Sequence, residues 1–282
     1  MIKWLRIKFI AVLLFNLPCV SGFTQSNISL KGFISDIKGN AIPYVNIGIA
    51  GKKTGTVSNV NGLFILELDS RLLQDSIRFS SIGYISKVLK IQDMVGSDST
   101  NHHIVLVSAF TALPEVIVTP KNLKIKVLGN TTRSKFMSGG FSSNELGAEA
   151  GTRIKIRKRP AYLEKVSFHL SYNKLDSIKI RLNIYAMNDG KPAENILPEN
   201  IILRLRDKQV GNVEVDLSKY DLMVKDDILI ALQLVEGKGD FRSSVFISAS
   251  MLGNPTYYRE ASHSTWKVYK GLSIGINVTV KQ

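Results

Sequence analysis

The chain has 282 residues, of which 44% are hydrophobic, and a formal net charge of +14. The charge is unevenly spread, because residues 114–160 hold ten basic and three acidic residues and so carry half of the net charge. The basic balance is therefore a local feature and does not indicate a nucleic-acid-binding surface on either half of the chain. About 260 residues follow an N-terminal leader, which is enough for two domains of ordinary size.

The leader, residues 1–22, has the three-part layout of a secretory signal peptide. Three basic residues precede an apolar stretch at 9–17, and small residues allow cleavage after Gly22. This stretch is well short of the ~20 residues that span a bilayer, and no later stretch approaches that length, so export without a transmembrane segment is predicted. Cys19 follows Pro18, where a lipoprotein signal needs small residues, so we interpret Cys19 as part of the discarded leader. The mature chain then has no cysteine for disulfides, thiolate metal sites or nucleophilic catalysis.

Residues 27–108 alternate apolar and polar side chains in short runs separated by turn signals, which is typical of an antiparallel sandwich. The Asn61-Gly62 dipeptide is suited to a type I′ hairpin turn. Seven strands are expected, near residues 28–34, 45–49, 54–58, 64–68, 76–80, 87–91 and 103–106.

Six motifs in this region resemble the carboxypeptidase-regulatory-like domain, a transthyretin-like sandwich. They lie, in the family's order, at residues 30–43, 45–47, 55–56, 61–64, 79–84 and 113–118. The resemblance covers about residues 27–118 and implies a seven-stranded Greek-key sandwich on an exported protein. The carboxypeptidase-regulatory-like domain is found on envelope proteins of gram-negative bacteria, including the N-termini of TonB-dependent receptors. The sequence departs from the family at Ser58-Asn59, where a Thr-Asp pair is common.

The family name implies no activity, because in metallocarboxypeptidases this domain accompanies a separate zinc hydrolase. The chain has four histidines, and none has the His-x-x-Glu or His-Glu-x-x-His spacing of a zinc hydrolase. We therefore expect no metal, no cofactor and no catalytic residues.

Residues 109–147 are predicted to form a basic connector. Thr119-Pro120 ends the preceding strand, lysines and arginines alternate with small polar residues, and Ser138-Gly139-Gly140 is a flexible sequence. Only ~160 residues remain beyond it, which is too few for the large barrel of a TonB-dependent receptor, so a receptor with its own pore is excluded.

A dense basic run follows the connector. Arg153, Lys155, Arg157 and Arg159 alternate with Ile154, Ile156 and Lys158, so the first four are expected on one face of a strand. A solvated strand edge is one interpretation. The other is contact with an anionic surface, such as lipid phosphates or a polysaccharide. Nucleic acid is not an expected partner, because the chain is exported and no aromatic side chains are interleaved.

Residues 148–282 are predicted to form a second, jelly-roll-like β-sandwich, for which we identify no family. The run at 228–234 is almost continuously apolar, which indicates a strand covered on both faces. Further strands are expected near residues 166–171, 178–185, 213–217, 245–250, 265–268 and 273–280.

Four aromatic side chains near the C-terminus form a candidate ligand-binding set: Tyr257, Tyr258, Trp266 and Tyr269. Sugar-binding sandwiches present flat rings to their ligands, so this set indicates glycan binding. The alternative is that Trp266 packs in the core and the tyrosines close its rim. A glycoside hydrolase would need two carboxylates facing each other across a cleft, and the sequence supplies no such pair.

These observations predict a non-catalytic accessory protein of the cell envelope that acts through its surfaces. The expected partners are an envelope protein or a glycan, with peripheral contact to a membrane surface as a further option. The expected location is the periplasm, the outer membrane or the cell surface. The alternatives are a zinc carboxypeptidase, a glycan hydrolase, or an adaptor of an outer-membrane transport or secretion complex.

Overall fold

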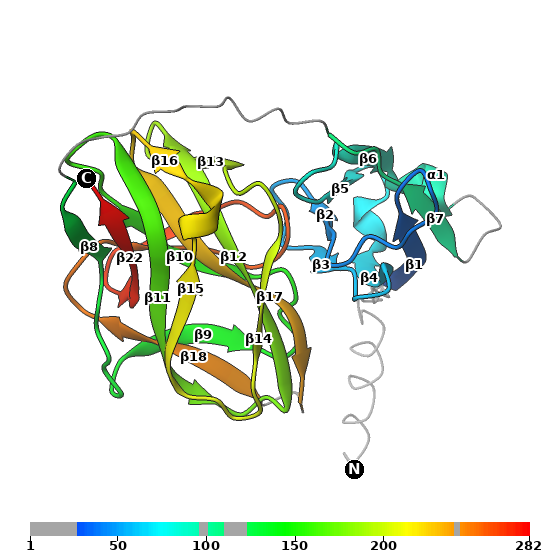
Figure 1. Ribbon diagram of the computed structural model, residues 1–282. Coiled ribbons are helices and arrows are strands. Elements are labelled where there is room, and N and C mark those ends of the chain that lie inside the picture. The colour runs from blue at the N-terminus through cyan, green and yellow to red at the C-terminus, as the bar shows by residue number, and fades with distance from the viewer. Residues whose placement is uncertain (1–26, 96–100, 110–122, 240–242) are drawn as a thin grey trace, which may run out of the picture.

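The computed structural model describes residues 27–95, 101–109, 123–239 and 243–282. The described chain is almost entirely β-structure, as predicted, and its strands form two sandwiches that lie side by side (Figure 1). The helical segments are short: α1 (Ile91–Val95) and two 3-10 turns, Ser70–Leu72 and Ser218–Tyr220. The predicted leader at 1–22 lies outside the described residues.

The first sandwich contains the seven predicted strands. Its three-stranded sheet has the order β4 (Leu63–Asp69), β1 (Asn27–Ser35), β7 (His102–Val105). Its four-stranded sheet has the order β3 (Gly55–Val57), β2 (Asn46–Ile49), β5 (Ser76–Ser80), β6 (Lys87–Lys90). The pairing is antiparallel except that β1 and β7 run parallel, which corrects the expectation of a fully antiparallel sandwich. The core between the sheets includes Ile34, Ile47 and Phe79, each fully buried.

The turn at Asn61-Gly62 is not the predicted hairpin, because the strands that it joins, β3 and β4, pair in different sheets. Gly62 has a φ of +73°, but Asn61 does not have the positive φ that a type I′ turn also needs at that position. Asn59 Oδ1 accepts hydrogen bonds from the backbone N–H groups of Asn61 (2.9 Å) and Leu63 (3.0 Å). An amide oxygen therefore caps the turn where the family commonly has a carboxylate.

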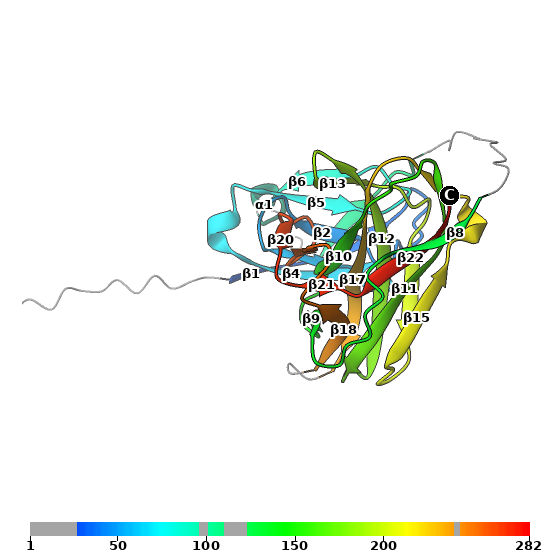
Figure 2. The same cartoon turned by 90° about the vertical axis from the view of Figure 1, so that its left-hand side faces the viewer.

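The second sandwich has two larger sheets. The sheet nearer the first sandwich, here the junction sheet, has the order β13 (Lys191–Asn195), β12 (Ser177–Asn188), β17 (Ile228–Lys238), β10 (Glu149–Ile154), β19 (Thr256–Arg259), β20 (Lys267–Tyr269), and β14 (Ile201–Leu205) also pairs with β12. The opposite sheet, here the groove sheet, has the order β21 (Ser273–Ile274), β18 (Ser244–Ser250), β11 (Ala161–Asn173), β22 (Ile276–Lys281), β8 (Ile125–Gly129). Strands β15 (Gly211–Asp216) and β16 (Met223–Val224) also pair with β11, and β9 (Ser138–Ser142) pairs with β18. Figure 2 shows the junction sheet between the first sandwich and the groove sheet.

Strand β17 confirms the prediction for the apolar run at 228–234. Ile230 and Leu232 face the main core of the second sandwich. Leu229 and Ala231 face the opposite side, where they pack with Tyr185 and Tyr257. A strand with apolar cover on both faces needs no polar alternation.

The described part of the predicted connector is not irregular. Strand β8 pairs with β22 and β9 pairs with β18, so both belong to the groove sheet and precede residue 148. Their sequences gave no strand signal, because the outermost strand β8 is mostly exposed on both faces and β9 contains Gly139-Gly140. An edge strand with two wet faces lacks the alternation that identifies a half-buried strand.

Candidate functional site

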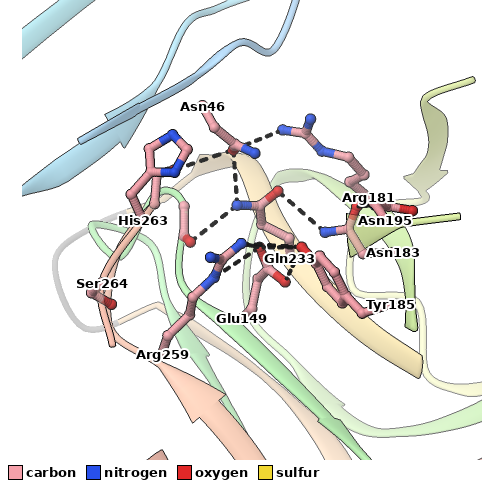
Figure 3. A network of polar contacts seen from close by, with 12 residues as sticks. Asn46, Glu149, Arg181, Asn183, Tyr185, Asn195, Gln233, Arg259, His263 and Ser264 are labelled. Atoms are coloured by element: carbon pink, nitrogen blue, oxygen red, sulfur yellow. Dashed lines mark hydrogen bonds and ion pairs between the residues drawn. The ribbon is translucent and has the colours of Figure 1, made fainter. Parts of the chain in front are cut away.

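The outer face of the junction sheet carries a row of buried polar side chains (Figure 3). The strand register places Arg181 beside Gln233, Gln233 beside Glu149, and Glu149 beside Arg259, across four adjacent strands. Glu149 and Arg181 are each 1% exposed and Gln233 is fully buried. Charged side chains are almost never buried to this extent without partners, so this face must be covered and its groups paired.

Asn46 of the first sandwich is the centre of that pairing. Its Oδ1 accepts hydrogen bonds from Arg181 Nη2 (3.2 Å), Gln233 Nε2 (3.0 Å) and Ser262 Oγ (3.2 Å). Arg181 Nη2 also donates to the carbonyl of Tyr44 (2.8 Å). The two sandwiches are therefore joined by a buried hydrogen-bond network, in addition to the chain that connects them.

Two glycines leave space for the second sandwich at this junction. Gly48 and Gly55 lie opposite each other in the β2–β3 hairpin, and the Ser262 carbonyl oxygen lies over both. A Cβ added to Gly55 would lie 2.7 Å from that oxygen, and one added to Gly48 would lie closer still. The backbone N–H of Gly51 donates to the carbonyl of His263 (3.0 Å). Loop 260–265 therefore fits into a notch that side chains would close.

The charges of the row are set by burial and by Glu149. Glu149 accepts a hydrogen bond from the Tyr185 hydroxyl (3.0 Å) and forms an ion pair with Arg259. Burial, reinforced by the Glu149 charge, raises the pKa of Tyr185. Burial opposes the charge of Arg259, but attraction by Glu149 and Tyr185 outweighs it and raises that pKa. Burial lowers the pKa of Arg181 to about 10, so Arg181 still carries its charge at neutral pH.

The structure places the four predicted aromatic residues on two faces of β19–β20 and the adjoining loop. Tyr257 is buried on the outer face, where its hydroxyl donates to the Gly190 carbonyl (3.2 Å). Trp266 lies on the same side, with the Arg259 guanidinium 4.7 Å from its ring centroid. Tyr258 instead packs against the main core, and Tyr269 is 55% exposed at the sheet edge. No single face presents all four rings.

The predicted basic run is divided between ion pairs and solvent. Arg153 forms an ion pair with Asp227 (2.6 Å), and Arg159 forms an exposed one with Asp226 (3.1 Å). Lys155 and Arg157 are exposed, while the intervening Ile156 is buried. The expected strand edge is corrected, because β10 lies between β17 and β19 and ends at Ile154.

A polar groove of about 220 Å³ lies on the outer face of the groove sheet. Its floor consists of three rows across β22, β11 and β15: Thr279 and Lys165, then Asn277, Ser167 and Glu214, then His169 and Asn212. Residues 131–133 line it from the β8–β9 loop. Lys165 Nζ forms an ion pair with Glu214 Oε2 (2.9 Å) across the floor. The groove therefore offers both hydrogen-bond donors and acceptors within a few ångströms of one another.

His169 presents an acceptor to this groove. Its Nδ1 lies 2.8 Å from Ser248 Oγ, and Ser248 Oγ in turn donates to the Ser134 carbonyl (2.7 Å). Since the Ser248 hydrogen is already donated, we assign the imidazole proton to Nδ1, which leaves Nε2 as an acceptor. Burial, with the charges of Arg133 and Lys135, lowers the pKa of His169, so the ring is neutral at neutral pH. Ser248 is fully buried and already bonded, so this pair has no exposed nucleophile.

Within the described ranges, no three potential ligands from His, Cys, Asp and Glu come together to hold a metal ion. No helix in the same ranges is long and apolar enough to cross a membrane.

Comparison with known proteins identifies the first sandwich. Residues 30–118 match the family model of the CarboxypepD_reg-like domain. The first sandwich is a carboxypeptidase-regulatory-like domain. This agrees with the resemblance found over residues 27–118, and the match ends before the second sandwich.

The solved structures similar to the whole chain are distant. One contains the cysteine protease and lectin-like domains of Cwp84, a surface-layer-associated protein of Clostridium difficile, at 10% identity and a TM-score of 0.40. A second is the same clostridial protease after propeptide cleavage, at 10% identity and a TM-score of 0.42. Both alignments cover 84% of this chain, which spans about half the length of those structures, 50% and 56%. A major pilin subunit of Bacillus cereus aligns at 12% identity and a TM-score of 0.19, over 88% of this chain and 69% of the pilin. No curated protein matches the chain.

Sequence reasoning missed the residues of both the junction and the groove. The alternating residues of β12, including Arg181, had the pattern of a solvent-facing strand, although the first sandwich covers that face. The groove residues of β15 and β22 follow their partners on β11 by about 45 and about 110 positions, and they meet only through the register of β11 with these two strands. The available signal was the alternation of Lys165, Ser167 and His169 with apolar residues, which placed them on one face.

Proposed function

We propose that this protein is an exported, non-catalytic binding protein of the cell envelope, and that the polar groove of its second sandwich binds a glycan. The single observation behind the ligand class is the composition of the groove floor. Sugar hydroxyls both donate and accept hydrogen bonds, and the floor sets amides, hydroxyls, an imidazole acceptor and an ion pair side by side.

The dimensions of the groove favour one sugar residue of a longer chain. Its volume of about 220 Å³ is below the ~300–1,000 Å³ of sites that enclose a drug-sized molecule. One wall is the β8–β9 loop, and the floor is a regular sheet that needs no rearrangement to receive a ligand. A short contact of this kind supports weak, selective binding along a polymer.

The junction supports a role for the protein as one unit. The buried network around Asn46 holds the carboxypeptidase-regulatory-like domain at a fixed place on the second sandwich. We infer export to the periplasm, the outer membrane or the cell surface from the predicted signal peptide and from the occurrence of this domain on exported proteins. An envelope protein is the second class of partner that such surfaces would serve.

The proposal is tested by a glycan array on the purified chain 23–282, followed by calorimetry on each glycan that binds. Asn277→Ala with Asn212→Ala removes two amides from the floor without touching the core. Each lost hydrogen bond is worth about 0.5–1.5 kcal/mol, so the double variant should bind about 5- to 150-fold more weakly. Asn188→Ala, an exposed amide at the end of β12, is the matched control and should bind like the wild type.

Two results would contradict the proposal. One is an array on which the folded wild type retains no glycan. The other is a double variant that folds and binds with unchanged affinity, because the glycan would then bind elsewhere. If the wild type captures one envelope protein and the double variant does not, the groove binds a protein partner and not a glycan.

A further inference from the structure

The most exposed apolar side chains of the described chain gather on two neighbouring loops. Phe136 is 100% exposed in the β8–β9 loop, and Leu252 (88%) and Met251 (70%) belong to the β18–β19 loop. These three have the largest exposed fractions among the large hydrophobic side chains of the described residues. Both loops lie on the side of the second sandwich remote from the first (Figure 1). We call the pair of loops, 131–137 and 251–255, the apolar tip.

Hydrogen bonds hold the two loops of the apolar tip beside each other. The backbone N–H of Ala249 donates to the Met137 carbonyl (2.8 Å), at the base of both loops. Asn130 Nδ2 donates to Ser250 Oγ (2.9 Å), and Ser250 Oγ donates to the Leu252 carbonyl (2.7 Å). Within the first loop, the N–H groups of Phe136 and Met137 both donate to a serine hydroxyl (3.2 Å each). The apolar side chains are therefore presented by braced loops.

The two loops of the apolar tip carry only positive charge. Residues 129–144, 243–259 and 261–282 contain no aspartate or glutamate. Arg133 and Lys135 precede Phe136 in the first loop, and no carboxylate of the described chain forms an ion pair with either. Lys270 lies in the β20–β21 turn, where the adjacent Leu272 carbonyl accepts a hydrogen bond from Thr256 N–H (3.1 Å), just after the second loop. The positive charges of the first loop also act on His169, whose pKa they help to lower.

We propose that the apolar tip docks the protein on the surface of an anionic lipid bilayer. Phe136, Leu252 and Met251 would enter the boundary between headgroups and acyl chains, and Lys135, next to Phe136, would contact lipid phosphates. A second copy of the chain fits this surface less well, because it would bring like charges together without a carboxylate to pair them. A glycan would cover at most the Phe136 ring and would leave the aliphatic side chains of Leu252 and Met251 in water.

Vesicle co-sedimentation of the full mature chain tests the docking. The probes are vesicles of phosphatidylcholine alone and of phosphatidylcholine with about one third phosphatidylglycerol. The wild type should bind the anionic vesicles and be released from them as salt rises. Phe136→Ser with Leu252→Ser should bind about tenfold more weakly or worse. Ile37→Ser, a change of an equally conspicuous side chain (69% exposed) on the first sandwich, should bind like the wild type.

A fluorescent label shows which part of the protein enters the bilayer. Because residues 23–282 contain no cysteine, Leu252→Cys can be labelled at a single position with an environment-sensitive dye. Its emission should shift to the blue on anionic vesicles, whereas a label at Ile37→Cys should not shift. The proposal is overturned if the wild type leaves anionic vesicles unbound, or if the double serine variant binds as well as the wild type. It is also overturned if the tip variants instead abolish a dimer that forms without lipid.

Discussion

Replacing Arg181 with methionine should loosen the docking of the two sandwiches. Arg181 is 1% exposed and donates to the Tyr44 carbonyl (2.8 Å), Asn46 Oδ1 (3.2 Å) and Asn200 Oδ1 (3.0 Å). Methionine fills much of the same space but donates no hydrogen bond. Two of these acceptors belong to the first sandwich, so the loss falls on the contact between sandwiches rather than on either core.

Two effects of opposite sign decide the magnitude. Hydrogen bonds from a charged donor are worth about 1.5–3 kcal/mol each, so losing three costs about 5–9 kcal/mol before relaxation. The variant also removes a buried charge, and the lowering of the Arg181 pKa from 12.5 to about 10 corresponds to a burial cost on the order of 3 kcal/mol. The lost hydrogen bonds outweigh the relieved burial, which leaves a net destabilisation of about 2–6 kcal/mol.

Calorimetry and urea unfolding of the chain 23–282 would measure this effect. The wild type should unfold in one cooperative transition, because neither sandwich can leave the junction without exposing buried charge. Arg181→Met should separate the transitions of the two sandwiches, and Arg181→Lys, which keeps the charge but not the fork of donors, should fall between them. A single transition in Arg181→Met at the wild-type midpoint would refute the idea that this network couples the sandwiches.

Three further changes test the junction by other means. Burial lowers the pKa of His263 from the ordinary 6.5 to about 4. Between pH 6.5 and pH 4 the unfolded chain therefore binds a proton at His263 that the folded chain does not bind. The free energy of unfolding should fall by about 3 kcal/mol as the pH drops through this range. His263→Asn, which tolerates the positive φ of 64° at this position, should flatten that slope in unfolding curves measured at each pH. Gly48→Ala should cost about 1–3 kcal/mol by overpacking against the Ser262 carbonyl, whereas Gly237→Ala, whose added Cβ would meet no atom closer than 3.4 Å, should cost less than 1 kcal/mol. Trp266→Leu should destabilise the chain by about 1–2 kcal/mol through its lost cation–π contact with Arg259, and it should leave glycan binding unchanged. Weaker glycan binding at unchanged stability would instead indicate that the aromatic residues near the C-terminus form the ligand site.

The sequence predicted a strand most clearly where one face of the strand is buried and the other is exposed to solvent. The seven strands of the first sandwich and the doubly covered run at 228–234 follow from patterns only a few residues long. Strand β8 escaped the same reasoning because both of its faces are largely exposed. Its place in the sheet depends on pairing with β22, about 150 residues later in the chain.

The junction was hidden for a different reason. Arg181, Gln233 and Glu149 form a row only because two pairs of strands, β12–β17 and β17–β10, share one register, and no local pattern encodes a register between distant strands. Alternation marked Arg181 as facing away from the core, which is true of the second sandwich alone. The face is buried by a different domain, and the glycines that admit this contact lie in that domain.

The β8–β9 loop connects the two proposed surfaces, because Thr132 and Arg133 line the groove while Phe136 forms part of the apolar tip. The loop is braced at both places, by the Ser248–Ser134 hydrogen bond beneath the groove and by the Ala249–Met137 bond at the tip. A ligand changes a distant affinity only if it favours one of two arrangements of the structure between the sites. A loop held in one arrangement transmits no such preference. Glycan affinity should therefore be the same in solution and on anionic vesicles, and a change of more than about threefold would show that the loop moves.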